Sequence, residues 1–321
     1  MRAFTIGKND EGTRVDRFVT KIVPRLPLSL LYKSIRLKRI KLNKKRCEIS
    51  TRLKEGDLLE LYISDEFFSE AATKCPFLSA PKEIDILYED DNILLVDKKP
   101  GLLVHEDDAE QVDTLINRIQ HYLYEQGEYN PGKENVFAPA LCNRIDRNTG
   151  GIVIAAKNAA SLRVLNQKIK DRELHKKYLC IVHGRMERKS DTLKAYMIKD
   201  ESKNQVRVFN TPGTGRRTMI TKYKVLSEKG RFSLLEVDLI TGRTHQIRAH
   251  MAHIGHPLLG DSKYGRNKDN QHTGFRYQAL YSYQLTFDFS TDAEHLTYLN
   301  GKTFTVKDVW FQKKFEDGEI L

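Results

Sequence analysis

The chain has 321 residues and a mass of 37.2 kDa, a size that suits two domains better than one. Its 40% content of hydrophobic residues, with 14 Phe and 14 Tyr, supports a sizeable core and excludes disorder as the overall state. No apolar run approaches the roughly 20 residues of a membrane helix, and residues 1–14 lack the apolar segment of a secretory signal. The four cysteines show no C-x-x-C spacing, which argues against a zinc site or a disulfide scaffold. We therefore expect a cytoplasmic protein without membrane contact.

Most of the positive charge lies near the amino terminus. Lys and Arg number 54 against 43 Asp and Glu, a net charge of +11, and residues 13–64 alone carry +9. No acidic residue occurs between Arg17 and Cys47, a stretch that holds eleven cations. Such cations repel one another unless an anion accompanies them, so this segment is predicted to bind nucleic acid. A solvated basic helical face is the alternative interpretation.

Residues 13–64 have the pattern of a small folded domain. Apolar residues at helical spacing predict a helix from position 15 that ends before Pro24 and Pro27. A second helix is expected over 28–37, with Ser29 as a candidate cap, and strands at 40–42 and 58–63. The candidate contacts to nucleic-acid phosphates lie around the second helix and the following hairpin: Arg36, Lys38, Arg39, Lys44, Lys45 and Arg46.

The second domain is expected over residues 83–321, after a linker at 65–82 that loses the periodicity and contains two prolines. Strands are predicted at 84–88, 93–96, 151–156, 178–183, 206–209, 219–226, 232–240 and 283–289. Helices are predicted at 114–125, 158–169 and 245–254, with Asn158 as the cap of the middle one. Because helices and strands do not alternate regularly, we expect an α+β fold with a mixed, mainly antiparallel sheet and flanking helices.

The stretch NRIDRNTGG (143–151) carries a candidate reactive carboxylate. Asp146 stands between Arg144 and Arg147, and two glycines follow that allow the backbone to turn tightly toward a ligand. Positive charge nearby favours the ionised carboxylate, which is the form that a nucleophile or a general base needs. A purely structural Arg-Asp-Arg ion cluster is the alternative interpretation.

Two later stretches add an aromatic residue and a polar helix start. In LHKKYLCIVHG (174–184), Tyr178 begins a predicted strand, a position typical of a core residue. In LITGRTHQIRAHMAHIGHPLLGDSKYG (239–265), a glycine turn leads into a helix with polar residues of the kind that bind an anion or a base. These residues are Arg243, His245, Gln246 and Arg248.

Other site classes fit the sequence poorly. His250, His253 and His256 have a spacing that suggests a metal site, but no H-E-x-x-H glutamate is present and no acid lies between 241 and 260. In addition, a glycine and a proline flank His256 and should end the helix before it. The G-x-S-x-G hydrolase motif and the phosphate-loop and dinucleotide fingerprints are also absent.

Taken together, these stretches resemble the motifs of the RluA-type pseudouridine synthases. NRIDRNTGG, KKYLCIVHG and ITGRTHQIRAHMAHIGHPLLGDSKYG match three family motifs, and YEDDNILLVDKKPGLLVH (88–105) matches the opening strand pair of their catalytic domain. LKRIKLNKKR and LKEGDLLELYI resemble the αL RNA-binding domain found in some members. The resemblance implies a pseudouridine synthase fold and a monomeric isomerase that acts on 23S ribosomal RNA without a cofactor or metal.

The resemblance also implies roles for single residues. Asp146 matches the aspartate that attacks the ribose or takes a ribose proton, so that the uracil detaches, turns and rejoins through carbon. Tyr178 matches the tyrosine that stacks on the target uracil and assists removal of its C5 proton, and Arg248 matches the arginine that pairs with the catalytic carboxylate. Arg144 matches the residue that fills the gap left by the target base. The further candidate substrate contacts are Arg147, Arg243, His245 and Gln246.

Two positions depart from the family pattern: Asn143 replaces a histidine, and Gly150 replaces a serine. Neither change removes a reacting group, so they bear on substrate and rate more than on the type of reaction. Two alternatives stay open at this point. One is an inactive RNA-binding assembly factor for the ribosome, and the other is a synthase that acts on tRNA.

Overall fold

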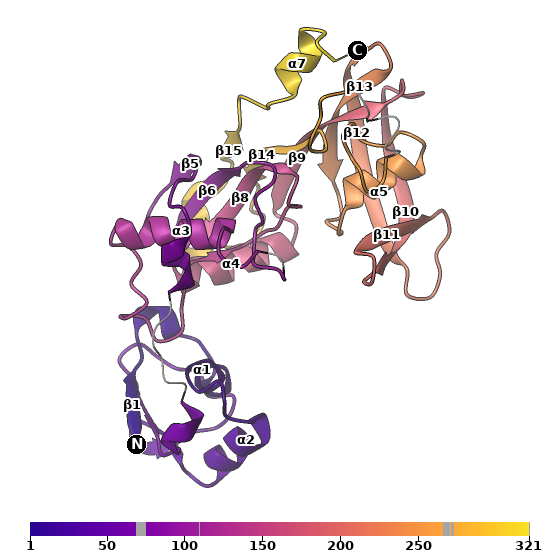
Figure 1. The fold of residues 1–321 in the computed structure, drawn as a ribbon. Helices are drawn as coiled ribbons and strands as arrows, with labels where there is room; N and C mark the ends of the chain where they lie inside the picture. The colour runs from indigo at the N-terminus through magenta and orange to yellow at the C-terminus, as the bar shows by residue number, and fades with distance from the viewer. Residues whose placement is uncertain (69–74, 109, 266–269, 271–272, 321) are drawn as a thin grey trace.

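The computed structural model describes residues 1–68, 75–108, 110–265, 270 and 273–320. These residues form two β-sheets, one of four strands near the amino terminus and one of eleven strands in the remainder of the chain. Figure 1 shows the four-stranded sheet at one end of the molecule and the outer strands of the large sheet at the other. Within the described ranges, no helix is long and apolar enough to cross a membrane.

The amino-terminal domain combines two helices with the four-stranded sheet, whose strand order is β1-β4-β2-β3. Both predicted helices are confirmed, because the apolar face that starts at Val15 lies in the domain core. The elements are β1 (Arg2–Thr5), the 3-10 helix η1 (Lys8–Asp10), α1 (Val15–Ile22), α2 (Leu28–Arg36), β2 (Ile40–Leu42), β3 (Lys45–Arg46) and β4 (Leu58–Leu61).

Two details of this domain differ from the prediction. Pro27, not Ser29, precedes α2, and no side chain caps that helix. Proline is tolerated there because the first N–H groups of a helix have no helical partner. Strand β1 lies before the predicted range of 13–64. It belongs to the domain because it pairs with β4, with Arg2 opposite Leu61. Such a non-local pairing leaves little trace in four residues of sequence.

The predicted linker carries short structure and joins the two domains. It contains η2 (Asp65–Phe67) and η3 (Pro76–Ser79), while residues 69–74 lie outside the described residues. Phe68 is buried in the amino-terminal core and Phe77 in the core beside α3 (Leu115–Glu125). The Asn135 amide also donates to Thr5 O at 2.8 Å and to Asp10 Oδ2 at 2.6 Å. The two domains are therefore joined by hydrogen bonds in addition to the linker.

The large sheet has the strand order β11-β10-β12-β13-β9-β14-β8-β6-β5, with β15 beside β14 and β7 beside β8. Only β14 and β8 pair in parallel among the described strands, so the predicted mixed, mainly antiparallel sheet is confirmed. Its strands are β5 (Ile86–Glu89), β6 (Ile93–Lys98), β7 (Ala140–Leu141), β8 (Gly150–Ala156), β9 (Leu174–His183), β10 (Ser190–Asp200), β11 (Gln205–Phe209), β12 (Arg217–Lys229), β13 (Phe232–Leu239), β14 (Leu280–Phe287) and β15 (Thr303–Thr305).

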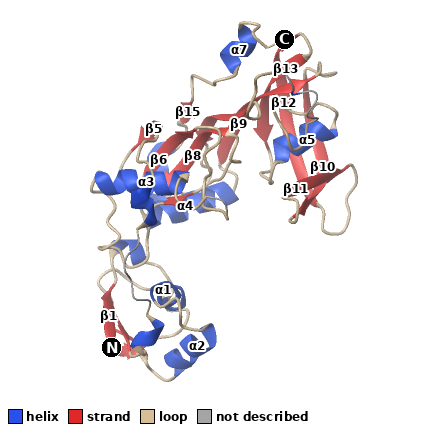
Figure 2. Ribbon diagram, in the orientation of Figure 1, coloured by secondary structure: helices blue, strands red, loops and turns tan. Residues whose placement is uncertain are grey.

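Helices flank this sheet at both ends. They are α3, α4 (Ala159–Lys170), α5 (Gln246–His253), the 3-10 helix η4 (Glu294–Leu299) and α7 (Gln312–Glu316). Figure 2 shows α3 and α4 beside the central strands and α5 beside the outer strands β10 to β13. The predicted Asn158 cap of α4 is confirmed, because its side chain accepts a hydrogen bond from Ser161 N at 2.8 Å.

The strand boundaries of the large sheet differ from the prediction at one important place. Strand β9 begins at Leu174, so Tyr178 stands in its middle and not at its start. Strand β10 was not predicted. Buried Ala195 and Met197 alternate there with less buried residues, but a small residue and several charges obscure the pattern. The ladder of β10 with β12 supplies the stabilisation that local propensity lacks.

Two adjacent glycines let β8 approach β14 closely. A Cβ at Gly150 would lie 2.3 Å from the ring of Tyr281, and a Cβ at Gly151 would lie 2.2 Å from Ser282 O. Gly151 also has a φ of +114°, a backbone conformation that other residues avoid. Only glycine fits at both positions, and this close approach sets the loop before β8 next to the middle of the sheet.

Candidate active site

Asp146 lies in the loop between β7 and β8, and two side chains hold this loop. Asn143 Oδ1 accepts a hydrogen bond from Ile154 N at 2.8 Å, which ties the start of the loop to β8. The buried Lys98 ammonium donates to three carbonyl oxygens, among them Arg147 O at 2.9 Å. Burial lowers the pKa of Lys98 to about 7. Asn143, one of the two departures from the family pattern, is therefore a structural brace here.

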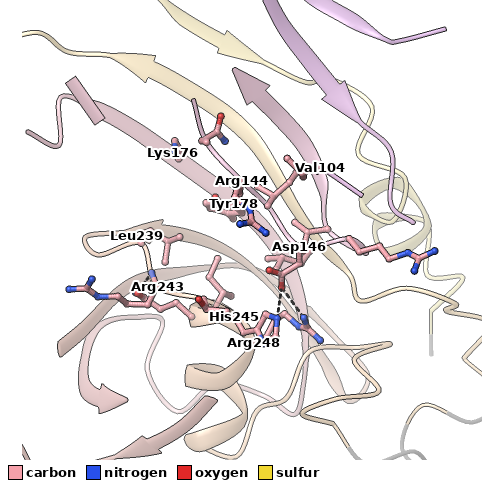
Figure 3. Close-up of a pocket in the computed structure, with 18 of the residues that line it drawn as sticks. Val104, Arg144, Asp146, Lys176, Tyr178, Leu239, Arg243, His245 and Arg248 are labelled. Atoms are coloured by element: carbon pink, nitrogen blue, oxygen red, sulfur yellow. Dashed lines mark hydrogen bonds and ion pairs between the residues drawn. The ribbon is translucent and has the colours of Figure 1, made fainter. Parts of the chain in front are cut away.

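A chain of ion pairs connects Asp146 to a buried carboxylate in the turn after α5. Arg248 Nη1 donates to Asp146 Oδ2 at 2.8 Å. The same guanidinium makes a bidentate pair with Asp261, from Nε to Oδ2 at 2.6 Å and from Nη2 to Oδ1 at 2.9 Å. The side chains of Arg248 and Asp261 are 8% and 0% exposed, whereas Asp146 is 26% exposed. Figure 3 shows Arg248 reaching Asp146 from α5.

The buried pair Arg248–Asp261 is charged on both sides. Burial alone would raise the pKa of Asp261, but the hydrogen bonds and charge of Arg248 hold this pKa below its ordinary value. Burial would likewise lower the pKa of Arg248, but its hydrogen bonds to Asp261 and the charges of the two nearby carboxylates raise it. Arg248 is therefore a fixed cation that directs one N–H at Asp146.

The two oxygens of Asp146 have different surroundings. Arg248 Nη1 contacts Oδ2, and His245 Nε2 lies 3.9 Å from the same oxygen. Among the residues that the structure describes, none donates a hydrogen bond to Oδ1. Oδ2 is thus anchored, while Oδ1 accepts no hydrogen bond from the part of the chain that the structure describes.

Tyr178 and Lys176 lie two residues apart on β9, and burial shifts the pKa of both side chains. Tyr178 is 7% exposed, and burial raises its pKa to about 12, so the phenol keeps its proton at neutral pH. Burial lowers the pKa of Lys176 to about 8. Figure 3 shows both residues along the same wall as Arg144. The site therefore offers a neutral aromatic ring and a cation that readily loses its proton.

A cavity of about 1160 Å³ brings the predicted catalytic-domain residues together. All eight of them line it: Arg144, Asp146, Arg147, Tyr178, Arg243, His245, Gln246 and Arg248. Further cations from other elements complete a basic wall: Lys170, Arg172, Lys176, Lys199 and Lys263. The six predicted contacts of the amino-terminal domain, from Arg36 to Arg46, lie outside this cavity. The cavity therefore combines many cations with the aromatic ring of Tyr178.

The structure corrects the local explanation for the charge of Asp146. The neighbouring Arg144 and Arg147 are exposed and make no ion pair with it within the described part of the chain. Arg147 Nε instead donates to Gly101 O at 3.0 Å. Arg248, which lies 102 residues away in sequence, is the partner of this carboxylate. Both neighbouring arginines instead remain exposed.

Gln246 is buried, and its amide bonds within the protein. Its Oε1 accepts from Thr241 Oγ1 at 2.8 Å and from Arg243 N at 3.1 Å. Its Nε2 donates to Ile220 O at 2.9 Å and to Thr221 Oγ1 at 3.0 Å. Gln246 thus fixes the turn that presents Arg243 and His245, and a direct contact with substrate stays a prediction.

The three histidines considered as metal ligands have three different partners. His250 contacts Thr221 Oγ1, His253 contacts Asn210 Oδ1, and His256 contacts a backbone carbonyl. Across the described ranges, no cluster of three potential ligands occurs.

Sequence reasoning missed three residues of the site. Asp261 and Tyr264 belong to the quoted stretch GDSKYG, but no local spacing links them to Arg248 or His245, because the contacts form only when the turn folds back on α5. Lys98 belongs to DKKPG, where a Pro-Gly turn is ordinary structure. A buried lysine that binds carbonyl oxygens becomes visible only in three dimensions.

The chain belongs to the RNA pseudouridylate synthase family, whose sequence model matches residues 92–253. An uncharacterised RNA pseudouridine synthase of Mycoplasma genitalium is 33% identical over 293 residues, which cover 88% of each chain. Ribosomal large subunit pseudouridine synthase C of Vibrio parahaemolyticus is 30% identical over 84% of this chain and 82% of the relative. The protein is therefore an RNA pseudouridine synthase of the RluA type, an isomerase, and the resemblance of its motifs is confirmed.

Two solved structures share the fold. Human RNA pseudouridylate synthase domain containing 4 superposes with a TM-score of 0.55 at 19% identity and covers 70% of this chain and 88% of its own. Human RNA pseudouridylate synthase domain containing 1 gives a TM-score of 0.54 at 20% identity, with 66% and 81% covered. The predicted α+β pseudouridine synthase fold is confirmed.

Asp261→Asn tests the support beneath Arg248. The variant leaves a buried guanidinium without its charged partner, so we expect the free energy of unfolding to fall by about 3 kcal/mol. Urea denaturation at pH 7 measures this loss. Asp288→Asn is the matched control, because Asp288 pairs with His175 on the surface and its loss should cost much less.

The pH dependence sharpens this test. Because Arg248 lowers the pKa of Asp261, their pair stabilises the fold above the ordinary carboxyl pKa of about 4. This stabilisation is lost as the pH falls through the lowered pKa, so the difference between wild type and Asp261→Asn should shrink in acid. A difference that stays constant from neutral pH to acid would contradict the pairing.

Proposed function

We propose that this synthase isomerises uridines of large-subunit, 23S ribosomal RNA, with Asp146 as the reacting carboxylate. The arrangement of Asp146, Arg248 and Asp261 at the base of a basic cavity is the observation that carries the proposal. The relative in Vibrio parahaemolyticus is named as a ribosomal large subunit enzyme, which supports this class of RNA. We also propose that the protein acts as a cytoplasmic monomer.

Asp146 would act through Oδ1 while Arg248 holds Oδ2. In the reaction, the bond between ribose C1′ and uracil N1 breaks as Oδ1 bonds to the ribose or takes a ribose proton, and the ribose–Oδ1 bond breaks, or the ribose regains its proton, when C5 bonds to C1′, so the Asp146 carboxylate is regenerated. The uracil then turns, its C5 bonds to C1′, C5 loses its proton and N1 gains one. Atoms and electrons balance within the nucleotide, so we propose that no cofactor or metal takes part. Keeping Oδ2 anchored leaves one oriented oxygen for the reacting atom.

Tyr178 would hold the uracil during this turn. A nucleotide that leaves its stack costs about a few kcal/mol, and stacking on an aromatic side chain returns about 1–3 kcal/mol. The raised pKa of Tyr178 keeps its ring a neutral phenol. Such a ring stacks on the base and can take part in removing the C5 proton once the base has bound. The exposed Arg144 at the cavity lies where it can occupy the space of the flipped base.

The amino-terminal domain would hold the RNA backbone. All six predicted cations, from Arg36 to Arg46, are exposed, and none of them forms an ion pair with a described acidic residue. They lie around α2 and the β2–β3 hairpin, where Lys38 and Lys44 have a left-handed backbone. Free, exposed cations of this density suit phosphate binding and make affinity depend on salt.

Asp146→Asn separates catalysis from binding. The variant keeps the size of the side chain and a hydrogen-bond acceptor but lacks the reacting anion, so pseudouridine formation should fall by at least about a thousandfold. RNA affinity should change by less than about threefold, since the cations carry binding. Pseudouridine mapping on unmodified large-subunit RNA, with tRNA in parallel, measures the product. A wild type that modifies neither RNA would support an inactive RNA-binding assembly factor. Modification of tRNA alone would support a synthase that acts on tRNA.

A triple variant tests whether the amino-terminal surface binds RNA. It replaces Lys44, Lys45 and Arg46 by Gln. Each phosphate contact contributes about 0.7–0.9 to the slope of log affinity against log salt, so the slope should fall by about 2. The matched control replaces Lys307, Lys313 and Lys314, which are equally exposed near α7, and should leave the slope unchanged. Equal slopes for the two triple variants would exclude the amino-terminal surface as the RNA contact.

A further inference from the structure

His245 occupies an unusual position beside the reacting carboxylate. It precedes α5 with a left-handed backbone, φ +51°, that is strained for a histidine. Its side chain is 9% exposed, and Nε2 lies 3.9 Å from Asp146 Oδ2. On the other side of the ring, Nδ1 lies 2.9 Å from the hydroxyl oxygen of Tyr264. Figure 3 shows His245 between Arg243 and Arg248, next to Asp146.

The surroundings of Tyr264 decide which imidazole nitrogen carries the proton. Its hydroxyl oxygen accepts a hydrogen bond from Val206 N at 2.9 Å. Burial raises the pKa of Tyr264, so the hydroxyl keeps its own proton and needs an acceptor. His245 Nδ1 is the acceptor within reach among the described residues. Since Nδ1 accepts, the proton of a neutral imidazole lies on Nε2, the nitrogen that faces Asp146.

Neutral imidazole is also the form that the site favours. Burial lowers the pKa of His245, and this effect outweighs the attraction of Asp146. The charged and titratable groups that face the ring come from the loop before β8, from α5 and from the turn after α5: Asp146, Arg248, Asp261, Lys263 and Tyr264.

We propose that Tyr264 is a positioning residue that fixes His245 in its Nε2–H form, so that His245 directs a hydrogen-bond donor at Asp146 Oδ2. The opposite tautomer would aim a nitrogen lone pair at the carboxylate and repel it. With Nε2–H in place, Arg248 and His245 both attract Oδ2 and leave Oδ1 as the reacting oxygen. This inference rests on the proposed role of Asp146.

The turn after α5 ties Tyr264 to the ion-pair chain. Tyr264 N donates to Asp261 Oδ1 at 3.1 Å. The Arg248 guanidinium carbon lies 5.3 Å from the centre of the Tyr264 ring, within the range of a cation–π contact. The residue that contacts His245 Nδ1 is therefore held by the same acid that holds Arg248, so both side chains near Asp146 Oδ2 share one support.

The tautomer can be measured directly on the full-length protein without substrate. Nitrogen and carbon chemical shifts of labelled histidine distinguish the two neutral forms, and His245→Gln identifies the signal. Wild type should show His245 as Nε2–H, and Tyr264→Phe should show a mixture of both forms. Tyr223→Phe is the matched control, because it removes another buried hydroxyl that bonds to a backbone carbonyl. An unchanged Nε2–H form in Tyr264→Phe would overturn the proposal.

Kinetics test the consequence for catalysis. Tyr264→Phe should lower kcat about tenfold and change KM for ribosomal RNA by less than about twofold, as expected for an oriented donor that acts in the transition state. The Gln amide reaches the place of Nε2, whereas the shorter Asn reaches only the place of Nδ1. His245→Gln should therefore have at least about a tenfold higher kcat than His245→Asn, although Asn tolerates the left-handed backbone better.

The two measurements separate this inference from the proposed function. Equal kcat values for His245→Gln and His245→Asn would overturn the donor role even if the tautomer is as expected. If wild type and Asp146→Asn were equally inactive on RNA, the proposed function would fail. The chemical shifts would still decide whether Tyr264 fixes the tautomer.

Discussion

A buried arginine constrains the whole site. Arg248 is 8% exposed, and a guanidinium removed from water costs several kcal/mol unless its N–H groups are paired. Asp261 satisfies one edge of the guanidinium with a bidentate pair, which leaves Nη1 directed at Asp146. The position of the Asp146 carboxylate thus depends on Asp261, a fully buried acid.

The fold brings these three residues together from distant parts of the chain. Gly150 and Gly151 let β8 pack directly against β14, and this contact sets the loop of Asp146 over the middle of the sheet. The outer strands carry α5 and the following turn, with Arg248 and Asp261, to the same place. Tyr178 comes from β9, which lies between these two parts in the sheet. The amino-terminal domain adds exposed cations that lie outside the cavity.

The sequence pointed to the side chains that line the cavity better than to the residues that support them. The motifs selected Asp146, Tyr178 and Arg248, which the structure brings together in one cavity, while their catalytic roles stay a prediction. Local signals predicted α1, α2 and the Asn158 cap of α4, because capping and helical periodicity act over a few residues. The pairing of Arg248 with Asp261 and of His245 with Tyr264 was not predictable, since each forms only when a turn folds back. For the same reason β1 and β10 escaped prediction, because their strand partners are remote in sequence.

The single-turnover rate of pseudouridine formation in Arg248→Lys, at saturating ribosomal RNA, tests the central claim most directly. Lysine keeps the positive charge but cannot bind Asp261 in two places and reach Asp146 at once. We predict a rate at least about a hundredfold below wild type, because a carboxylate misplaced by about 1 Å loses that much. RNA affinity should change by less than about twofold. A rate close to that of wild type would contradict the claim that Arg248 places the reacting carboxylate.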